Sequence, residues 1–306
     1  MQKLFSHILL FLQLTVFVVL FFLPIFSFSQ KTTKIDLVSA NSLEFDKRIN
    51  EDVKRLIGNV VLKHDETFLY CDSAYLYSES NSVDAYGNVR ISSGTVTITG
   101  KTLKYDGDTK TAQLNKNVKL NDNEMTLTTE FLTYNTKSDI GNYTTGGKIT
   151  DPENVLTSTI GYYYANDKQF FFKKNVVLVN PQYTMRSDTL MYNTVTEVSY
   201  FYGPTTIESK ENTIYCENGW YDSKKDIAQF NKNASFSNKE QSICGDSLYY
   251  DRNLGFGKAF KNITVIDTVK DIILKGKLDS QDLGKYPNPG ILICIKNGKV
   301  KEINFN

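Results

Sequence analysis

Histidine, tryptophan and proline are scarce in this 306-residue chain, which contains two, one and six of them. Beyond residue 29 the single histidine is His64. A His-rich metal site is therefore excluded, and a Ser–His–Asp triad would have one candidate base. We expect His64 on the surface. The lone Trp220 stands beside Tyr221 at a repeat position that holds Lys104 or Thr133 elsewhere, and we assign it to an exposed face without a defined role.

Neither sign of charge predominates. Without Lys3 of the N-terminal segment, the chain has 34 Lys+Arg (35 less one) against 34 Asp+Glu, and so a formal charge of zero. A nucleic-acid-binding domain normally carries a basic excess. The balance therefore argues against nucleic acid as a partner, although it does not exclude local patches.

One long apolar run extends from Ile8 to Phe26, with Lys3 before it and Ser27-Phe28-Ser29 after it. A short positive segment, an apolar run and a small-x-small site predict a secretory signal peptide over residues 1–29. A retained membrane anchor is the alternative, because the run approaches the length of a membrane span. No cysteine lies near the site, which argues against lipid modification. In either case residues 30–306 are expected outside the cytoplasmic membrane.

One sequence tract recurs at a nearly constant period from one end of the chain to the other. Its clearest markers are Leu76, Tyr105, Tyr134, Tyr164, Tyr192, Tyr221 and Tyr250, separated by steps of 29, 29, 30, 28, 29 and 29. A fixed period indicates one supersecondary unit that is copied and stacked. The sequence therefore predicts an elongated body with a continuous surface or groove, and not a compact enzyme with one pocket.

Each copy contains short stretches in which apolar residues alternate with others, as in strands with one buried face. One stretch follows Gly-Asn or Lys-Asn, as at 87–91 and 116–120, and Gly and Asn tolerate the left-handed backbone of a bulge. The next stretch changes parity between Ile98 and Leu103, so the strand must bend near Gly100. The copy at 140–164 is irregular, which suggests a longer bend there.

The fold class predicted from these patterns is all-β. Thr, Tyr, Phe and Val are abundant, and no helical period follows residue 29. Two architectures fit: an antiparallel folded sheet, forming a V-shaped or jellyroll-like trough, and a parallel β-helix. Short turns between the stretches favour the antiparallel sheet. Both enclose a long apolar interior.

The four cysteines are not expected to form structural disulfides. Cys71 and Cys216 occupy the same repeat position five copies apart. At about 4.8 Å per strand, that separation exceeds disulfide reach. Cys216 and Cys244 differ by one register position, which turns them to opposite faces. Cys294 lies outside the repeat.

Acidic residues also recur once per copy, at Asp72, Glu130, Asp188, Glu217 and Asp246. Repeated carboxylates suit Ca²⁺, and paired carboxylates can cleave polysaccharides. However, Lys101 takes this place in one copy, and no pair differs from the rest. We therefore favour a solvated corner, and we expect no metal, no cofactor and no catalytic residues.

The export signal and the repeated Gly-Asn-Val-x-apolar … Asp/Glu-x-Leu-x-Tyr units resemble the OstA-like family of lipopolysaccharide transport, over roughly residues 35–283. That family includes a periplasmic bridge protein and the N-terminal domain of the outer-membrane translocon. The resemblance implies a twisted, open β-jellyroll or folded trough in the periplasm. It also implies lipopolysaccharide acyl chains inside, sugars outside, and end-to-end joining by strand addition.

The expected organisation has three parts. Residues 1–29 are the signal peptide, 30–283 the OstA-like β-repeat domain, and 284–306 a segment outside the repeat. Within the last part, 291–295 and 299–305 flank Asn297-Gly298, which predicts a β-hairpin with a type I′ turn. This hairpin is interpreted as a cap on the trough or as a truncated tail.

The functional hypothesis is a periplasmic protein that carries lipopolysaccharide or lipid A in a hydrophobic groove towards the outer membrane. Its expected partners are other jellyroll-type transport components, or further copies of itself, joined through edge strands. One alternative is a structural or adhesive surface β-solenoid with a closed core. A weaker one is a carbohydrate-active β-helix.

The predicted groove lining consists of inward-facing apolar and tyrosine positions from three copies. They are Val89, Ile91, Val96, Ile98, Leu103, Tyr105, Val118, Leu120, Met125, Leu127, Leu132, Tyr134, Val176, Leu178, Tyr183, Met185, Leu190 and Tyr192. A charged residue at Ile98 or Leu127 is expected to abolish lipid capture.

Overall fold

The computed structural model describes residues 33–45, 53–122, 125–269, 272–276, 291–296 and 299–305. The chain divides into two units, residues 1–32 and 33–306, and every described residue belongs to the second. The predicted signal peptide lies outside the described residues. In the described part of the chain, no helix has the length and apolar character that a membrane span requires.

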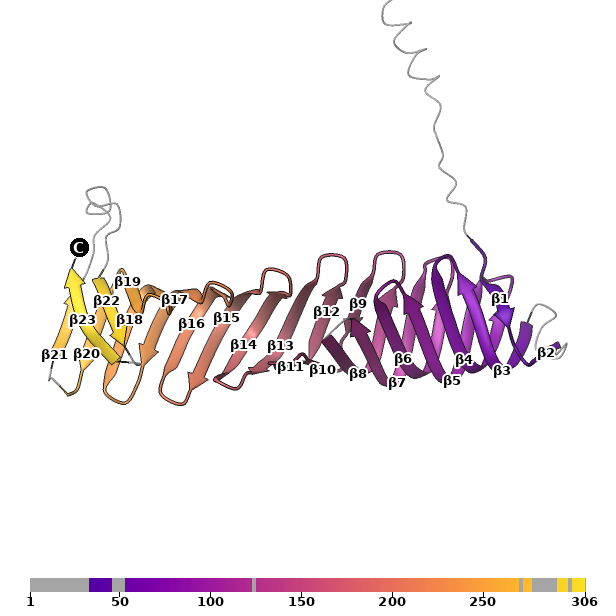
Figure 1. Cartoon of the computed structure of the whole chain (residues 1–306), viewed down its shortest axis with the longest axis horizontal. Helices are drawn as coiled ribbons and strands as arrows, with labels where there is room; N and C mark the ends of the chain where they lie inside the picture. Colours follow the sequence, from indigo (N-terminus) through magenta and orange to yellow (C-terminus); the bar gives the residue numbers. More distant parts are fainter. Residues whose placement is uncertain are drawn as a thin grey trace, which may run out of the picture. The chain divides into compact units, whose positions relative to one another are not determined.

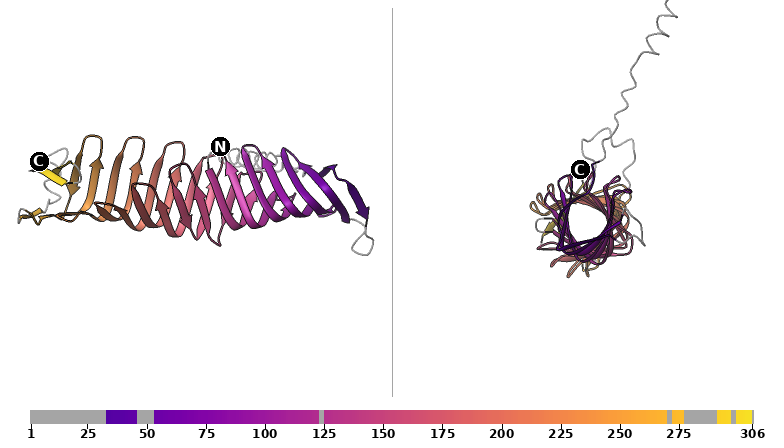
Figure 2. Two further views of the ribbon diagram at one scale, coloured as in Figure 1. Left: turned by 60° about the horizontal axis from the view of Figure 1, so that its bottom comes forward. Right: turned by 90° about the vertical axis from the view of Figure 1, so that its right-hand side faces the viewer.

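The described residues form one 23-stranded sheet in which all strand pairings are antiparallel (Figure 1). This confirms the antiparallel architecture and excludes the parallel β-helix. Seen along its length, the sheet curls around a common axis (Figure 2). The inner face of the curled sheet carries one continuous hydrophobic core.

Each copy of the repeat is a hairpin of two long strands. Successive hairpins begin at a constant step along the sequence, at Val53, Ser82, Thr111, Ile140, Gln169, Val198, Ile227 and Phe256. The regular hairpins are β3 (Val53–His64) with β4 (Thr67–Tyr77), β5 (Ser82–Ser93) with β6 (Val96–Asp106), β7 (Thr111–Asp122) with β8 (Met125–Asn135), β13 (Gln169–Val179) with β14 (Tyr183–Asn193), β15 (Val198–Ser209) with β16 (Thr213–Asp222), and β17 (Ile227–Ser237) with β18 (Gln241–Asp251).

The first strand of each regular hairpin is bent by a bulge at the predicted place. Gly87 and Asn88 have φ of 71° and 43°, and Lys116 and Asn117 have φ of 65° and 53°. The cross-strand pairing skips these residues. The bulge shifts the inward–outward alternation, so that apolar side chains point inward both before and after the bend. The parity change between Ile98 and Leu103 has the same origin, since both are buried.

The strands are longer than predicted. The sequence pattern predicts a strand only after the bulge, whereas in the structure the same strand begins well before it, as in β5 from Ser82 and β7 from Thr111. One inward position of this segment recurs once per copy and is buried throughout, at Leu56, Ala85, Leu114, Tyr143, Phe172, Phe201, Phe230 and Ala259. These residues add a second wall to the core.

The repeat is also more regular than predicted. Tyr163 points inward with 3% exposure, whereas its neighbour Tyr164 is half-buried. The marker in this copy is therefore Tyr163 and not Tyr164, and with it all the steps from Tyr105 to Tyr250 become equal.

The fourth hairpin is irregular, as predicted for residues 140–164. Its strands are broken into β9 (Ile140–Tyr143), β10 (Gly147–Thr150), β11 (Val155–Ser158) and β12 (Ile160–Tyr164). The Tyr143 ring fills the break. A Cβ on Gly147 would lie 2.5 Å from this ring, and one on Gly161 would lie 2.4 Å from it. The Tyr143 hydroxyl lies 2.7 Å from the Ser158 hydroxyl.

Short strands cover both ends of the meander. β1 (Asp36–Ser39) and β2 (Ser42–Phe45) pair with β3. At the other end, β19 (Phe256–Phe260) and β20 (Ile263–Asp267) pair with β22 (Ile291–Lys296) and β21 (Ile272–Gly276), respectively. β22 also pairs with β23 (Lys299–Phe305), and these are the two strands of the predicted C-terminal hairpin. Its turn and the expected linker at 284–290 lie outside the described residues.

Candidate functional site

Two rows of turns border the inner face of the sheet. Row A joins the two strands of each copy and includes residues 65–66, 94–95, 151–154 and 180–182. Row B joins each copy to the next at 78–81, 107–110, 136–139, 165–168, 194–197, 223–226 and 252–255. Backbone hydrogen bonds link consecutive row B turns, from Gly107 N to Asn81 O at 2.8 Å through to Arg252 N to Asp226 O at 3.0 Å. Row B is therefore a continuous rim.

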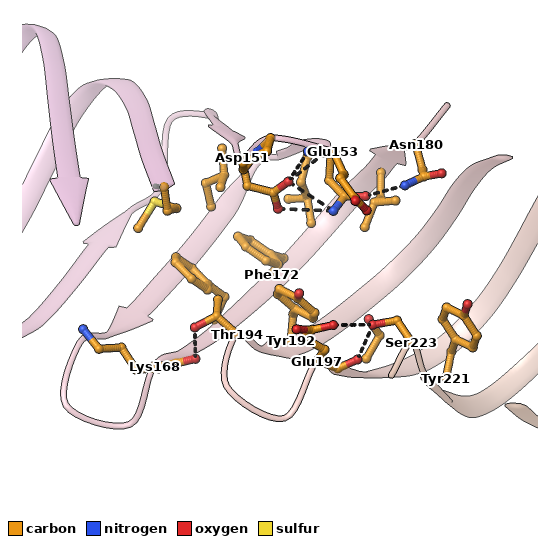
Figure 3. Close-up of a pocket in the computed structure, with 18 of the residues that line it drawn as sticks. Asp151, Glu153, Lys168, Phe172, Asn180, Tyr192, Thr194, Glu197, Tyr221 and Ser223 are labelled. Carbon is orange, nitrogen blue, oxygen red and sulfur yellow. Dashed lines mark hydrogen bonds between the residues drawn. The ribbon is translucent and has the colours of Figure 1, made fainter. Parts of the chain in front are cut away.

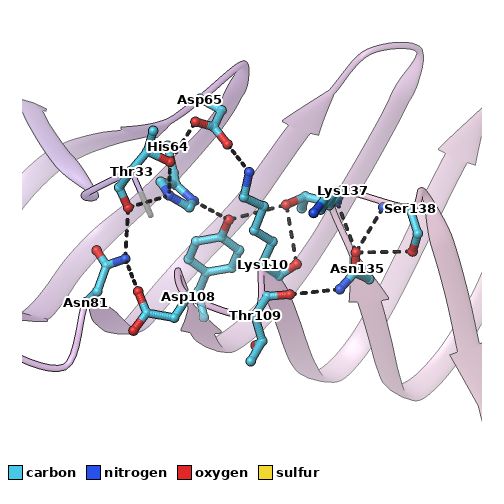
Figure 4. A network of polar contacts seen from close by, with 12 residues as sticks. Thr33, His64, Asp65, Asn81, Asp108, Thr109, Lys110, Asn135, Lys137 and Ser138 are labelled. Carbon is cyan, nitrogen blue, oxygen red and sulfur yellow. Dashed lines mark hydrogen bonds and ion pairs between the residues drawn. The ribbon is translucent and has the colours of Figure 1, made fainter. Parts of the chain in front are cut away.

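The two rows are tied together at the N-terminal end. Asp65 of row A forms an ion pair with Lys110 of row B. Beneath it, His64 Nδ1 lies 2.7 Å from the Tyr105 hydroxyl (Figure 4). Thr33 lies over this contact, with its hydroxyl 2.8 Å from His64 Nε2 and its carbonyl accepting from Asn81 Nδ2 at 3.0 Å. These contacts close the trough here.

The expected surface position of His64 is therefore wrong. His64 is 1% exposed. Its ring has polar partners on both sides, Tyr105 and Thr33, which allow burial without loss of hydrogen bonding. The position ends an apolar strand, Val60-x-Leu62-x-His64, and alternation alone places it inward.

A second bridge between the rows involves Asp122 and Lys168. Lys168 Nζ lies 2.8 Å from Asp122 Oδ2, and the Tyr163 hydroxyl donates to the same oxygen. Burial acts to raise the pKa of the Asp122 carboxyl, but hydrogen bonds from Lys168, Tyr163 and Thr95, together with the charge of Lys168, hold the pKa below its ordinary value. A third bridge lies farther along, where Arg252 Nη1 donates to Gln182 Oε1 at 3.2 Å.

Between the second and third bridges the trough is open. A cavity of about 750 Å³ lies between rows A and B. Figure 3 shows Asp151, Glu153 and Asn180 on one side and Lys168, Thr194, Glu197 and Ser223 on the other. The apolar and aromatic part of its wall consists of Met125, Ile149, Leu156, Tyr163, Phe170, Phe172, Leu178, Tyr183, Tyr192 and Tyr221.

Aromatic side chains dominate this wall. The Tyr163 and Phe170 rings stack with centroids 4.4 Å apart, and Phe170 and Phe172 stack at 5.7 Å. Burial raises the pKa of Tyr192 to about 12, and burial also raises the pKa of Tyr163 and Tyr221. The tyrosine hydroxyls are therefore neutral at ordinary pH, and the wall is uncharged.

The rim of the cavity is more acidic than basic. Asp151, Glu153, Glu197 and Asp226 line it, together with Lys168 and Arg252. Both cations already have partners across the mouth, Asp122 and Gln182. An apolar chain inside and a hydroxylated group at the rim suit this arrangement.

The predicted lining residues all lie on the inner side, but they separate into two groups. Met125, Leu178, Tyr183 and Tyr192 line the cavity. The others are packed in the core with exposed fractions of 0–3%: Val89, Ile91, Val96, Ile98, Leu103, Tyr105, Val118, Leu120, Leu127, Leu132, Tyr134, Val176, Met185 and Leu190. Lipid contact by any of them stays a prediction.

Several cavity residues were missed by the sequence analysis. Ile149 and Leu156 lie in the irregular copy, which the regular pattern skips. Phe170 and Phe172 precede a bulge, in the strand segment that was not predicted. The signal for Phe172 was present in the sequence, since it occupies the same repeat position as Tyr143 in the copy before and Phe201 in the copy after.

The recurring acids have a structural role at the bulges. Asn88 donates to Asp72 at 2.9 Å, Asn233 to Glu217 at 2.8 Å and Asn262 to Asp246 at 2.9 Å. Each of these three acids therefore holds the asparagine of the neighbouring bulge. Among the described residues, no three His, Cys, Asp or Glu side chains gather where they would hold a metal ion. Cys71, Cys216 and Cys244 are free thiols.

The second bridge gives a prediction about pH. The folded pKa of Asp122 is lower than its unfolded pKa, so its ionisation stabilises the fold above about pH 4 and ceases to do so as pH falls through the folded pKa. We expect Asp122→Asn to lower the free energy of unfolding by about 1–3 kcal/mol at pH 7. The difference from the unsubstituted protein should shrink towards pH 2, as measured by urea denaturation.

The matched control is Glu44→Gln. Glu44 pairs with Arg55 at 3.2 Å, but both side chains are 49% exposed. An exposed pair contributes about 0.5 kcal/mol or less, so this variant should show little change at any pH. A loss for Asp122→Asn that is the same at pH 7 and pH 2 would contradict the assignment.

Comparisons with known proteins agree with the repeat pattern. Residues 32–188 and 186–246 match the family model described as OstA-like protein. Among proteins with curated descriptions, none matches this chain. One similar solved structure is LptH, the LptA-homologous periplasmic component of the lipopolysaccharide transport device of Pseudomonas aeruginosa. It has 14% identity and a TM-score of 0.31, over 42% of this chain and 85% of that chain. Because the family model spans more than half of the 306 residues, the chain belongs to the OstA-like protein family.

Proposed function

We propose that the protein binds lipopolysaccharide, or its lipid A part, in the periplasm and passes it towards the outer membrane. The acyl chains would lie in the cavity between rows A and B, and the sugars outside it. The observation that carries this proposal is the open stretch of trough, about 750 Å³ in volume with an aromatic and aliphatic wall. Membership of the OstA-like family supports it.

The energetics favour binding without any chemical step. Exposure of a fourteen-carbon acyl chain to water costs on the order of 10 kcal/mol, at about 0.8 kcal/mol per methylene. An uncharged trough removes most of that cost. No catalytic residue is required, which is consistent with a binding and transport protein.

The ends of the sheet support the proposed partners. β1 and β2 pair only with β3 among the described strands, so each leaves one edge free there. They also expose Val38 and Phe45, with exposed fractions of 56% and 63%. Edge strands of this kind are templates for strand addition by another β-protein. Other jellyroll-type transport components, or further copies of this chain, are the proposed partners.

One observation favours the second candidate, a structural β-solenoid with a closed core. In the copies from β3 to β8 the core is tightly packed and the mouth is bridged, with Leu62, Ile91, Leu120 and Tyr134 all at 0% exposure. A closed scaffold would have this character along its whole length. The open stretch beyond Asp122 and Lys168 is what separates the two candidates.

The test is native mass spectrometry of the protein purified from an envelope extract without harsh detergent. A co-purifying mass of lipopolysaccharide or lipid A would support the proposal. A bare protein mass, together with no uptake of added lipopolysaccharide, would refute it and leave the closed scaffold as the better account.

A further inference from the structure

A row of aromatic side chains runs along the outer face of the sheet, close to row B. Cross-strand pairing places one residue of each strand opposite the next at the same height. In order along the sheet this outer row is Arg55, Tyr75, Asp84, Lys104, Gln113, Thr133, Asn142, Tyr162, Phe171, Met191, Tyr200, Trp220, Gln229, Tyr249 and Lys258.

The row faces outward because its neighbours in each strand face inward. Phe171 stands between the buried Phe170 and Phe172, and Tyr200 between the buried Ser199 and Phe201. Tyr200 is itself 38% exposed. It lies three residues from the row B turn at 194–197, a distance of about 10 Å at 3.3 Å per residue. The outer row therefore runs beside the rim of the trough.

The repeat supplies its own comparison for this row. The same structural position holds Gln113, Thr133 and Asn142 in the middle of the chain, and the sheet is continuous there. Pairing of the strands therefore does not require aromatic side chains at the outer-row position. From Tyr162 to Tyr249 the position changes to Tyr, Phe, Met, Tyr, Trp, Gln and Tyr.

The change coincides with the opening of the trough. The cavity begins at the Asp122–Lys168 bridge and is lined mainly by residues of β12 to β16, such as Tyr163, Phe172, Tyr192 and Tyr221, together with Met125 of β8, Ile149 of β10 and Leu156 of β11. Four rings of the outer row, Tyr162, Phe171, Tyr200 and Trp220, occur on β12, β13, β15 and β16, on the opposite face, and Tyr249 follows on β18. The strands from β3 to β9 carry a mainly polar row, and the strands from β12 to β18 carry a mainly aromatic one.

The chemistry of this part of the row favours a neutral, hydroxylated ligand. From Tyr162 to Tyr249 it contains no charged residue, although the Lys173 ammonium lies over the Phe171 ring at 4.9 Å. Rings of Tyr and Trp offer flat apolar faces with a polar tip. Amide side chains flank them at Asn142 and Gln229. Flat apolar faces beside amides match the C–H faces and hydroxyls of sugar rings.

We propose that the outer aromatic row, centred on Tyr200 and Trp220, is a binding track for the saccharide part of a glycolipid whose acyl chains occupy the trough. The inference rests on the proposed function for its lipid part. The saccharide leaves the mouth, passes over row B and lies along the rings. The row then adds affinity for long saccharides without contact with the acyl chains.

The first test uses Trp220 as a reporter, since it is the single tryptophan of the chain. The probe is a neutral oligosaccharide, free of phosphate and carboxylate groups, made of the repeating units of a lipopolysaccharide O-chain. We expect the emission of Trp220 to change and to saturate as oligosaccharide is added. In the Tyr200→Gln variant, the affinity obtained from this titration should be about threefold lower. An emission that does not change at millimolar oligosaccharide would overturn the proposal.

The second test uses two lipids with the same acyl chains, lipid A and a lipopolysaccharide with an extended saccharide. The double variant Tyr200→Gln/Trp220→Thr places the residues of Gln113 and Thr133 in the row. It should bind the lipopolysaccharide about tenfold more weakly and lipid A unchanged. Equal affinity for the lipopolysaccharide, or an equal loss for both lipids, would overturn the proposal. Tyr75→Thr, at the same position beside the bridged mouth, is the control and should change neither affinity.

Failure of the proposed function has a different signature. In that case the unsubstituted protein takes up neither lipid, while the free oligosaccharide still changes the emission of Trp220. That result would retain the saccharide track and remove its lipid context.

Discussion

The variant Leu178→Asp is expected to lose lipid A binding by about 100-fold while keeping its fold. Leu178 lines the cavity, and its side chain is 9% exposed there. A carboxylate there remains in contact with water in the empty protein. When acyl chains fill the cavity the charge loses that water, at a cost of about 3 kcal/mol. Binding of a fluorescent lipid A measures the loss, and circular dichroism checks the fold.

The matched control is the adjacent Val177→Asp. Val177 is on the same strand but on the opposite face, where it pairs with Arg186 and Thr157. The same carboxylate there meets solvent in the empty and the loaded protein, so lipid binding should be unchanged. Full retention of binding by a folded Leu178→Asp protein would refute the assignment of the cavity to acyl chains.

The structure also changes which positions are suitable for a charged substitution that tests lipid binding. Ile98 and Leu127 were the positions chosen from sequence, but they are 0% and 2% exposed and pack in the bridged part of the trough. A charge at either is expected to unfold that part of the sheet, which would remove lipid binding for an unrelated reason. Leu178 avoids this ambiguity because its surroundings are already open.

The variant Gly161→Ala is expected to lower the free energy of unfolding by about 3 kcal/mol. Its new Cβ would lie 2.4 Å from Tyr143 ring atoms, a distance at which the ring must move. The ring has little room to do so, because the backbone of Gly147 is so close that a Cβ there would also lie 2.5 Å from the ring, and the Ser158 hydroxyl lies 2.7 Å from the Tyr143 hydroxyl. Overpacking of this kind costs about 1–3 kcal/mol. Urea denaturation followed by tyrosine fluorescence measures it.

A double-mutant cycle separates the clash from any intrinsic effect of alanine. In a Tyr143→Ala background the added methyl group has free space, so Gly161→Ala should cost less than about 1 kcal/mol. Gly100→Ala is the control in a regular copy, since its Cβ would meet nothing closer than 3.5 Å. An unchanged cost in the Tyr143→Ala background would show that the ring is not the cause.

The architecture could be predicted from the sequence because one period carries most of the information. Asn88 and Asn117 marked the bulges, and the inward direction of Ile98 and Leu103 required the bend that the structure contains. The C-terminal strands at 291–296 and 299–305 also pair as predicted. The division into a signal peptide, a repeat domain and a C-terminal segment stays a prediction.

The site was harder to predict because periodicity cannot distinguish an open copy from a closed one. Ile98 and Leu178 follow the same alternation, yet the first is packed and the second faces a cavity. The difference depends on contacts between residues far apart in sequence, such as Asp65 with Lys110 and Asp122 with Lys168. His64 was misplaced although its place in the alternation Val60-x-Leu62-x-His64 directs it inward; the partners that allow its burial, Thr33 and Tyr105, lie far from it in the sequence.

The uniform spacing of the hairpins has an evolutionary consequence. Each copy begins at the same interval after the one before and returns the chain to the same direction and the same face. Duplication or deletion of one whole copy therefore leaves every remaining strand in register, whereas an odd shift within a strand exchanges its buried and exposed faces. Relatives of different length are expected to differ by whole hairpins, so that the length of the trough can change in steps while its cross-section stays the same.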